Sequence, residues 1–108
     1  MKHALTAFVA LGLLHLASQA CAQEMGDAKK GADLAQSVCA ACHAVRAGET
    51  RSPNAKAPTF ASVASSRGMT ETALRVWLQS PHPTMPNLML DEDAKDDVIA
   101  YILSLKAR

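Results

Sequence analysis

The stretch Ser37–Arg46, SVCAACHAVR, places two cysteines three positions apart and a histidine directly after the second. The two thiols alone are compatible with a disulfide, a redox-active pair or half of a zinc site. None of these explains why His43 follows Cys42 without a gap. The order Cys-x-x-Cys-His is the known signal for covalent attachment of a c-type haem.

Haem attachment gives each residue of this motif a chemical role. Cys39 and Cys42 would add to the two vinyl groups of the porphyrin as thioethers, and a gap of two residues lets both sulfurs reach one ring edge. His43 then lies beneath the iron and supplies an axial nitrogen. Ala40 and Ala41 are small and leave the approach open. We therefore expect one covalent haem c held by these residues.

The rest of the sequence argues against two rival interpretations. A structural zinc site needs four ligands, usually from a second Cys-x-x-Cys or a His pair, which the sequence lacks. A thioredoxin-like pair lies at a strand-to-helix junction, and no useful strand-like alternation is present. A module without haem, with Cys39 and Cys42 as a disulfide, is left as a third possibility.

The N-terminal residues have the order of a secretory signal: a charged start, an apolar run from Ala4 and a small-residue segment. Cleavage is expected after Ala22, with Ala20 as the alternative position. The predicted organisation is a signal peptide at 1–22 and a single exported domain at 23–108. The expected location is the periplasm.

The apolar run is shorter than the roughly 20 residues that span a bilayer, which argues against an uncleaved membrane anchor. No other segment of the sequence is apolar enough to cross a membrane, so we expect no stable membrane insertion after cleavage. Lipid anchoring through Cys21 is a minor alternative, since lipoprotein signals usually carry leucine where this chain has Ser18. Without Lys2, ten basic residues balance ten acidic ones. This balance offers no basic surface for nucleic acid. The expected partners are redox proteins, whose identity the charge does not reveal.

Three helices and two long loops are predicted for the exported domain, which makes its fold class all-α. Each helix begins at an Asp or Thr that can cap it, and prolines and polar residues mark the loops. The helices are expected at about 27–41, 70–79 and 91–106, and the loops at 44–59 and 80–90, with a short helical turn in 60–68. Loops of this length need something to pack against, and an apolar cofactor would serve.

The second axial ligand is expected from the loop at 80–90. Met85 directly precedes a proline, and such a loop can hold a side chain rigidly without a helix. A thioether ligand favours Fe(II) and raises the reduction potential. We predict Met85 as the ligand and leave Met89 and His82 as alternatives.

With CAACH, APTF, PTMPNL and DDVIAYILSL in this order, the exported domain resembles class I monohaem cytochromes c of the small bacterial type. The resemblance implies a fold of three to four short helices and long loops around the haem, and an exposed haem edge that passes electrons. It also implies that the carbonyl of Pro58 accepts the second N–H of His43.

In this family a glycine of the first helix meets an aromatic residue of the last, and Gly31 and Tyr101 match these positions. The family often carries an aromatic residue where this chain has Ala35. The contact between first and last helices is therefore either thinner here or compensated by Leu34.

The expected function is electron transfer with His43 and Met85 as axial ligands, as a periplasmic carrier or as the haem subunit of an oxidoreductase. The protein is not expected to be an enzyme itself. The alternative is a five-coordinate haem that binds a small gas or peroxide, which requires Met85 to be absent or labile. Trp77 and Tyr101 are expected to be core residues, packed on helices or against the haem ring, rather than electron relays. Arg51, Arg67 and Trp77 are candidates for contact with the haem propionates.

Overall fold

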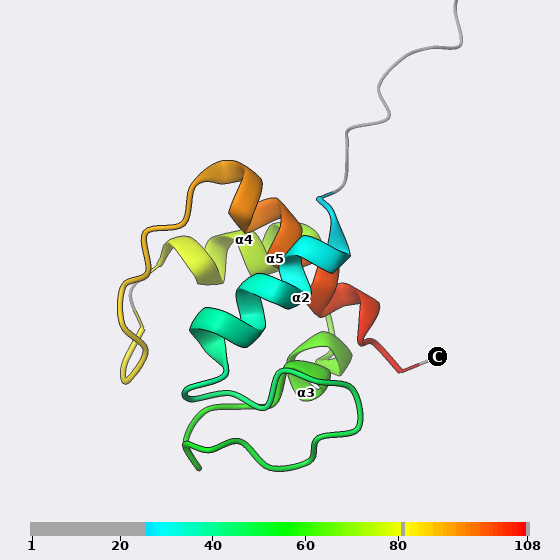
Figure 1. The fold of residues 1–108 in the computed structure, drawn as a ribbon, viewed down its shortest axis with the longest axis vertical. Helices are drawn as coiled ribbons and strands as arrows, with labels where there is room; N and C mark the ends of the chain where they lie inside the picture. Colours follow the sequence, from blue (N-terminus) through cyan, green and yellow to red (C-terminus); the bar gives the residue numbers. More distant parts are fainter. Residues whose placement is uncertain (1–25, 81, 108) are drawn as a thin grey trace, which may run out of the picture.

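The computed structural model describes residues 26–80 and 82–107, which form helices joined by loops (Figure 1). In this part of the chain no strand is present, and the predicted all-α fold is confirmed. The predicted signal peptide and Cys21 lie outside the described residues. The elements in chain order are the α-helix α2 (Ala28–Leu34), the π-helix η1 (Ala35–Cys39) and the α-helices α3 (Phe60–Ser65), α4 (Glu71–Gln79) and α5 (Glu92–Ser104).

The predicted capping residues start the three longer helical segments. The side chains of Asp27, Thr70 and Asp91 each accept backbone N–H groups from the first turn of the following helix. These bonds satisfy donors that have no partner inside the helix. Thr59 caps the short helix α3 in the same way. The predicted loop at 44–59 is confirmed, and the described residues of the predicted loop at 80–90 contain no helix.

The first helical segment does not continue as an α-helix to residue 41. At Ala35 the helix α2 widens into η1, where the N–H of Ala40 donates to the carbonyl of Ala35, five residues back, at 2.9 Å. Such π-helical turns are rare and occur frequently at functional sites. Here the π-helix ends at Cys39, so it sets the point at which the cysteine motif leaves the helix.

The helices α2 and α5 pack closely together, as Figure 1 shows. A Cβ atom on Gly31 would overlap the backbone carbonyl of Asp97 and lie 2.9 Å from the Cβ of Tyr101. The expected contact between Gly31 and Tyr101 is therefore confirmed. The possibility that this packing is thin at Ala35 is wrong, because Ala35 is fully buried in the core and Leu34 packs against it.

The helix α5 contributes three residues to a small, mainly aliphatic core. Helices on several sides and the segment after the cysteine motif pack around it. The cluster consists of Ala35, Val45, Phe60, Ala64, Leu74, Val98, Ile99 and Ile102.

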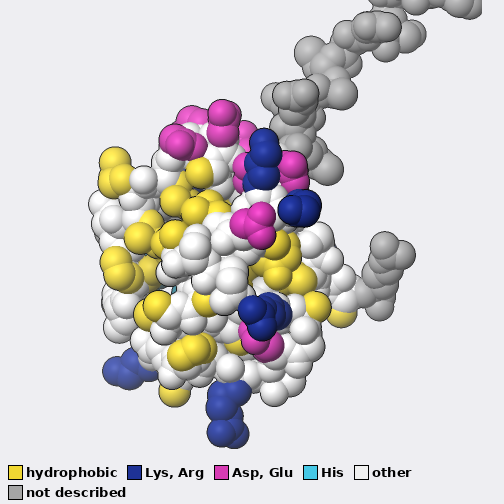
Figure 2. All heavy atoms as spheres, viewed as in Figure 1, with side chains coloured by type: hydrophobic (Ala, Val, Ile, Leu, Met, Phe, Trp, Pro, Cys, Tyr) yellow, Lys and Arg dark blue, Asp and Glu magenta, His cyan; other side chains and the backbone are white. Residues whose placement is uncertain are grey.

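Charged side chains tie α4 to α5 at the surface. Arg75 of α4 pairs with Glu71 of its own helix and with Glu92 and Asp96 of α5. Figure 2 shows acidic side chains gathered at the end of the molecule where α5 begins, and basic side chains projecting at the opposite end. The helices in the described ranges include none with the length and apolarity needed to cross a membrane.

Candidate haem site

The cysteine motif forms one tight turn directly after η1. The N–H groups of Cys42 and His43 both donate to the carbonyl of Cys39, at 3.1 Å and 2.9 Å. Cys39 and Cys42 are half-buried and carry free thiols, so the structure does not support the disulfide alternative. The turn thus presents two free thiols and an imidazole from one short piece of backbone.

The environment of these thiols differs from that of a redox or zinc site. Burial raises the pKa of the Cys39 thiol, whereas a redox-active cysteine needs a lowered pKa. Within residues 26–80 and 82–107, no three His, Cys, Asp or Glu side chains are grouped to hold a metal ion. A half-buried thiol that is not activated for redox exchange suits a sulfur that becomes a thioether. Cys39 is such a thiol, Cys42 and His43 lie on the same turn, and the residues present therefore fit a covalent haem.

The imidazole of His43 is oriented by the loop at 44–59. Its Nδ1 atom lies 2.7 Å from the carbonyl oxygen of Pro58. A carbonyl oxygen can only accept, so Nδ1 carries the proton and Nε2 keeps its lone pair. The ring also packs against Phe60, with 5.4 Å between the two ring centroids. Nε2 is thereby the atom of His43 available to a metal.

The same loop fastens the backbone around His43. The N–H of Asn54 donates to the carbonyl of Cys42 at 3.1 Å, and the N–H of Ala44 donates to the buried Oγ of Ser52 at 3.0 Å. Sequence reasoning missed both Asn54 and Ser52. No motif distinguishes them, because their role depends on how a polar loop folds back on the cysteine turn.

The loop at 80–90 contains both methionines considered as axial ligands, and it places them in different environments. Met85 is half-buried, whereas Met89 is 89% exposed. The N–H of Met85 donates to the carbonyl of His82 at 3.3 Å, and the preceding Thr84 has a φ of 74°. The left-handed backbone conformation of Thr84 turns the chain just before Met85. The protein covers part of the Met85 side chain at this point.

Trp77 does not lie in the protein core, which was one of the two packings expected for it; packing against the haem ring stays a prediction. Its side chain is 55% exposed, because α4 directs Leu74 and Leu78 toward the core and leaves Trp77 at the edge. There its ring meets the edge of His82, with 5.3 Å between centroids. His82 is further engaged by its Nδ1 atom, 3.0 Å from the carbonyl of Ser80.

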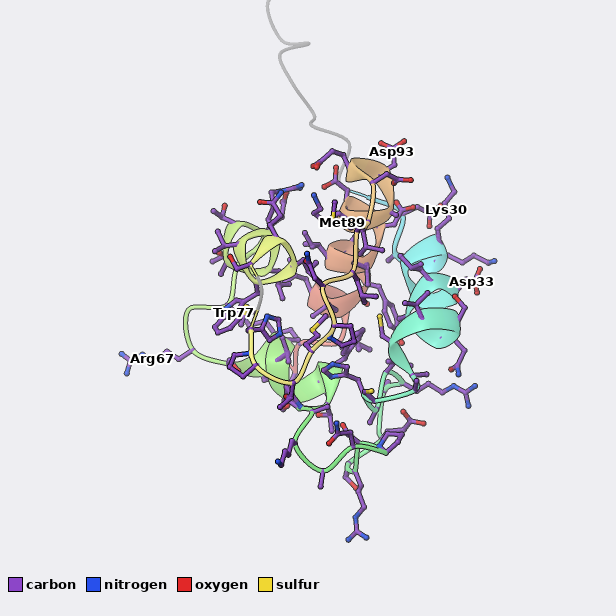
Figure 3. All side chains as sticks on the ribbon, turned by 90° about the vertical axis from the view of Figure 1, so that its left-hand side faces the viewer. Lys30, Asp33, Arg67, Trp77, Met89 and Asp93 are labelled. Carbon is purple, nitrogen blue, oxygen red and sulfur yellow. The ribbon has the colours of Figure 1, made fainter. Side chains whose placement is uncertain are left out.

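Tyr101, in contrast, is half-buried against the core, in agreement with the prediction for that residue. Figure 3 shows the labelled Arg67 extending outward from the molecule, away from the other side chains. The contact of Arg51, Arg67 or Trp77 with a haem propionate stays a prediction.

Residues 26–102 match the family model described as cytochrome c oxidase, cbb3-type, subunit III, and the chain belongs to this family. It is a small class I monohaem cytochrome c with a covalently bound haem c, and it functions in electron transfer. These statements confirm the predicted family and cofactor.

A curated relative supports the same class. The chain is 39% identical to cytochrome c-552 of Bradyrhizobium diazoefficiens over 94 residues, which cover 87% of this chain and 89% of the relative. No solved structure matches the chain.

Proposed function

We propose that this cytochrome carries single electrons between periplasmic redox proteins, with His43 and Met85 as the two axial ligands of its haem iron. When bound, the haem supplies a metal that alternates between Fe(III) and Fe(II). Cys39 and Cys42 would hold it as thioethers. The cytochrome c-552 relative supports an electron carrier rather than an enzyme. The family description, which names subunit III of a cytochrome c oxidase, supports the other role expected for this chain, the haem subunit of an oxidoreductase.

The observation that carries this proposal is the 2.7 Å contact between His43 Nδ1 and the Pro58 carbonyl. Because Nδ1 is the donor, Nε2 is free to bind iron, and the ring is held in one orientation. Donation to a carbonyl also increases the electron density on the imidazole, which makes it a stronger ligand. Pro58 therefore acts on the iron only through His43.

Met85 is the sixth ligand that the loop geometry supports best. It is half-buried beside a fixed turn, whereas Met89 is almost fully exposed and His82 contacts Trp77 and Ser80. Two protein ligands leave no open position for a substrate. Electron exchange through the haem edge is then the chemistry that remains, for a free carrier and for the haem subunit of an oxidoreductase alike.

The location and organisation follow from the N-terminal sequence. We propose cleavage of a signal at 1–22 and export of the domain at 23–108 to the periplasm, where partner proteins donate and accept electrons. The mass of the protein recovered from the periplasm tests this proposal. It should equal a chain that starts at Gln23 plus one haem, without a lipid and without membrane association.

Substitution of the two methionines tests the ligand assignment. In the oxidised wild-type protein, a sulfur-to-Fe(III) bond should give an absorption band near the red edge of the visible spectrum. Met85→Ala should abolish this band, and Met89→Ala should leave it unchanged. The opposite pattern would contradict the assignment, and rapid binding of carbon monoxide by the reduced wild-type protein would support a five-coordinate haem instead.

A further inference from the structure

We propose that Tyr101 of α5 is a positioning residue for His43, and this inference rests on His43 being the proposed axial ligand. The hydroxyl of Tyr101 donates to the carbonyl of Val45 at 2.6 Å, across 56 positions of sequence. Val45 is only 2% exposed and lies two residues after His43. The bond therefore holds the backbone next to the imidazole from a distant helix.

Tyr101 connects the histidine segment to the closely packed pair of helices α2 and α5. The bonds from Ser52 and Asn54 come from the loop that follows the motif, so they join that segment only to its own loop. Tyr101 instead belongs to α5, whose backbone touches α2 where Gly31 permits no Cβ atom. The hydroxyl thus fixes the segment after His43 relative to the helix pair rather than to a loop.

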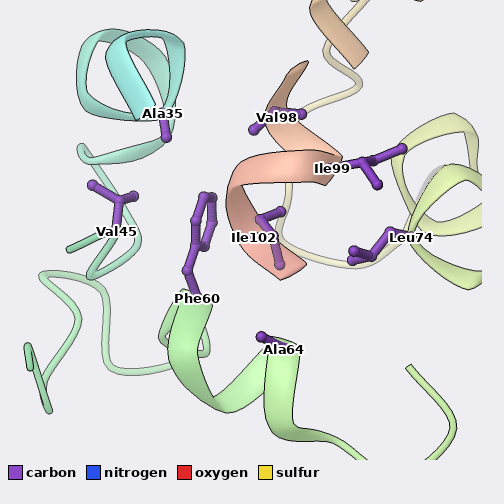
Figure 4. Packing of buried hydrophobic residues seen from close by; sticks show 8 residues of the cluster. All are labelled: Ala35, Val45, Phe60, Ala64, Leu74, Val98, Ile99 and Ile102. Carbon is purple, nitrogen blue, oxygen red and sulfur yellow. The ribbon is translucent and has the colours of Figure 1, made fainter. Parts of the chain in front are cut away.

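The ring of Tyr101 is also linked to the imidazole of His43, through the ring of Phe60. Its centroid lies 6.5 Å from that of Phe60, which in turn lies 5.4 Å from the imidazole of His43. Phe60 is buried, and Figure 4 shows its ring between Val45 and Ile102. The N–H of Phe60 also donates to the carbonyl of Ala44 at 2.9 Å. The hydroxyl of Tyr101 therefore holds the backbone next to His43, and the ring of Tyr101 supports the imidazole of His43 through Phe60.

Loss of the hydroxyl would leave the buried carbonyl of Val45 without this donor, and the segment would shift to find another. The contact between His43 Nδ1 and Pro58 depends on the position of this segment. A weaker contact makes the imidazole a poorer electron donor, which stabilises Fe(III) less. Tyr101 would therefore affect the reduction potential without touching the metal.

The test compares Tyr101→Phe with the wild-type holoprotein. This variant keeps the ring and removes only the hydroxyl. In hydrogen exchange followed by NMR, the His43 Nδ1–H and the Phe60 amide should exchange about fivefold faster, the effect of one lost hydrogen bond. The amide of Ala73, in α4, should be unchanged, and the reduction potential should become more positive.

Ser104→Ala is the matched control, because it removes another hydroxyl of α5 that bonds only to the local carbonyl of Tyr101. It should change neither the His43 exchange rate nor the potential. Phe60→Leu tests the ring route separately and should also accelerate exchange at His43.

Two results would overturn the inference. Equal acceleration at Ala73 and at His43 would show that the hydroxyl only adds global stability. Unchanged exchange at His43 in Tyr101→Phe would show that it does not position the imidazole. If His43 were not a ligand of the haem iron, the wild-type protein itself would lack haem-shifted imidazole signals of His43. That result would contradict the proposed function and is distinct from the two results above, which concern Tyr101 alone.

Discussion

At Gly31 the backbones of α2 and α5 lie so close together that a Cβ atom would not fit between them. An added Cβ atom would overlap the carbonyl of Asp97, which is backbone and cannot rotate away. Ala is a better helix former than Gly by about 1 kcal/mol, but overpacking costs about 1–3 kcal/mol and can cost more. Because the obstructing atoms are backbone, the cost lies at the upper end of this range, and after the helix-propensity gain we expect Gly31→Ala to lower the free energy of unfolding by about 2 kcal/mol. Urea unfolding of the holoprotein, followed by haem absorbance, measures this change.

Gly48 provides the control for this substitution. It lies in a loop with a φ of 81°, and nothing lies within 4 Å of the position that its Cβ would take. Gly48→Ala should therefore cost only the left-handed backbone conformation, about 1 kcal/mol. If both variants lost the same stability, close packing would not be the reason for glycine at position 31.

The starts of the helices could be predicted because their signals are local. Asp27, Thr70 and Asp91 each bond to N–H groups two or three residues further along the chain. The ends of α4 agree with the prediction, since Pro81 prevents continuation of the helix. The loops at 44–59 and 80–90 could likewise be predicted from their prolines and polar residues.

The π-helix and the position of Trp77 could not be predicted in this way. An i→i+5 bond at Ala35 depends on how α2 and the cysteine turn are held by the rest of the fold, and helical periodicity does not distinguish it from an α-helical bond. Trp77 repeats at helical spacing with Leu74, yet Leu74 is buried and Trp77 is exposed. Its exposure depends on how two helices cross, which the sequence pattern does not contain.

The cap of α2 leads to a prediction about acid stability. The N–H groups of Lys30 and Lys29 donate to the Asp27 carboxylate and lower its pKa below the ordinary value for aspartate. A lowered pKa in the folded state stabilises the fold above the unfolded-state pKa, and this stabilisation is lost as pH falls through the folded-state pKa. Asp27→Ala should therefore melt at a lower temperature than the wild type at neutral pH, and the difference should shrink in acid.

Asp27→Asn separates charge from capping, because asparagine also caps helices well but does not titrate in this range. It should keep most of the neutral-pH stability and should not show the additional loss in acid. Thermal unfolding at a series of pH values measures all three proteins. A wild-type and alanine variant that differed equally at every pH would contradict a role for the ionised carboxylate.

The candidate haem site combines residues that the sequence can and cannot identify. The cysteine motif is contiguous, so its chemistry can be read directly, and the family resemblance places Pro58 beside His43. Ser52 and the hydroxyl bond of Tyr101 were not predictable, because each joins the motif to a segment whose position only the fold determines. The ion pairs of Arg75 with Glu92 and Asp96 depend in the same way on the crossing of two helices.

The hydrophobic core of the protein is small compared with the length of the loops that fold around it. Phe60 is the one aromatic residue among the buried hydrophobic positions in the described part of the chain, and three of the others are alanine. Domains of this size bury a limited fraction of their surface and often depend on a cofactor or a covalent link. The loops at 44–59 and 80–90 carry the ligands proposed for the haem, or hold them in place. The haem would therefore complete the core as well as supply the redox centre.

This dependence predicts that the chain without haem does not fold cooperatively. Cys39→Ala combined with Cys42→Ala should prevent covalent attachment, and the purified polypeptide should lose most of its helical circular dichroism and its thermal transition, because the remaining apolar contacts do not offset the entropy of ordering the loops. The wild-type chain produced without the haem-attachment machinery is the control, since it keeps both thiols and lacks only the haem. It should behave like the double variant. If the wild-type chain without haem instead unfolded in one cooperative transition, the helices and their aliphatic contacts would suffice for the fold, and the haem would contribute only its electron chemistry.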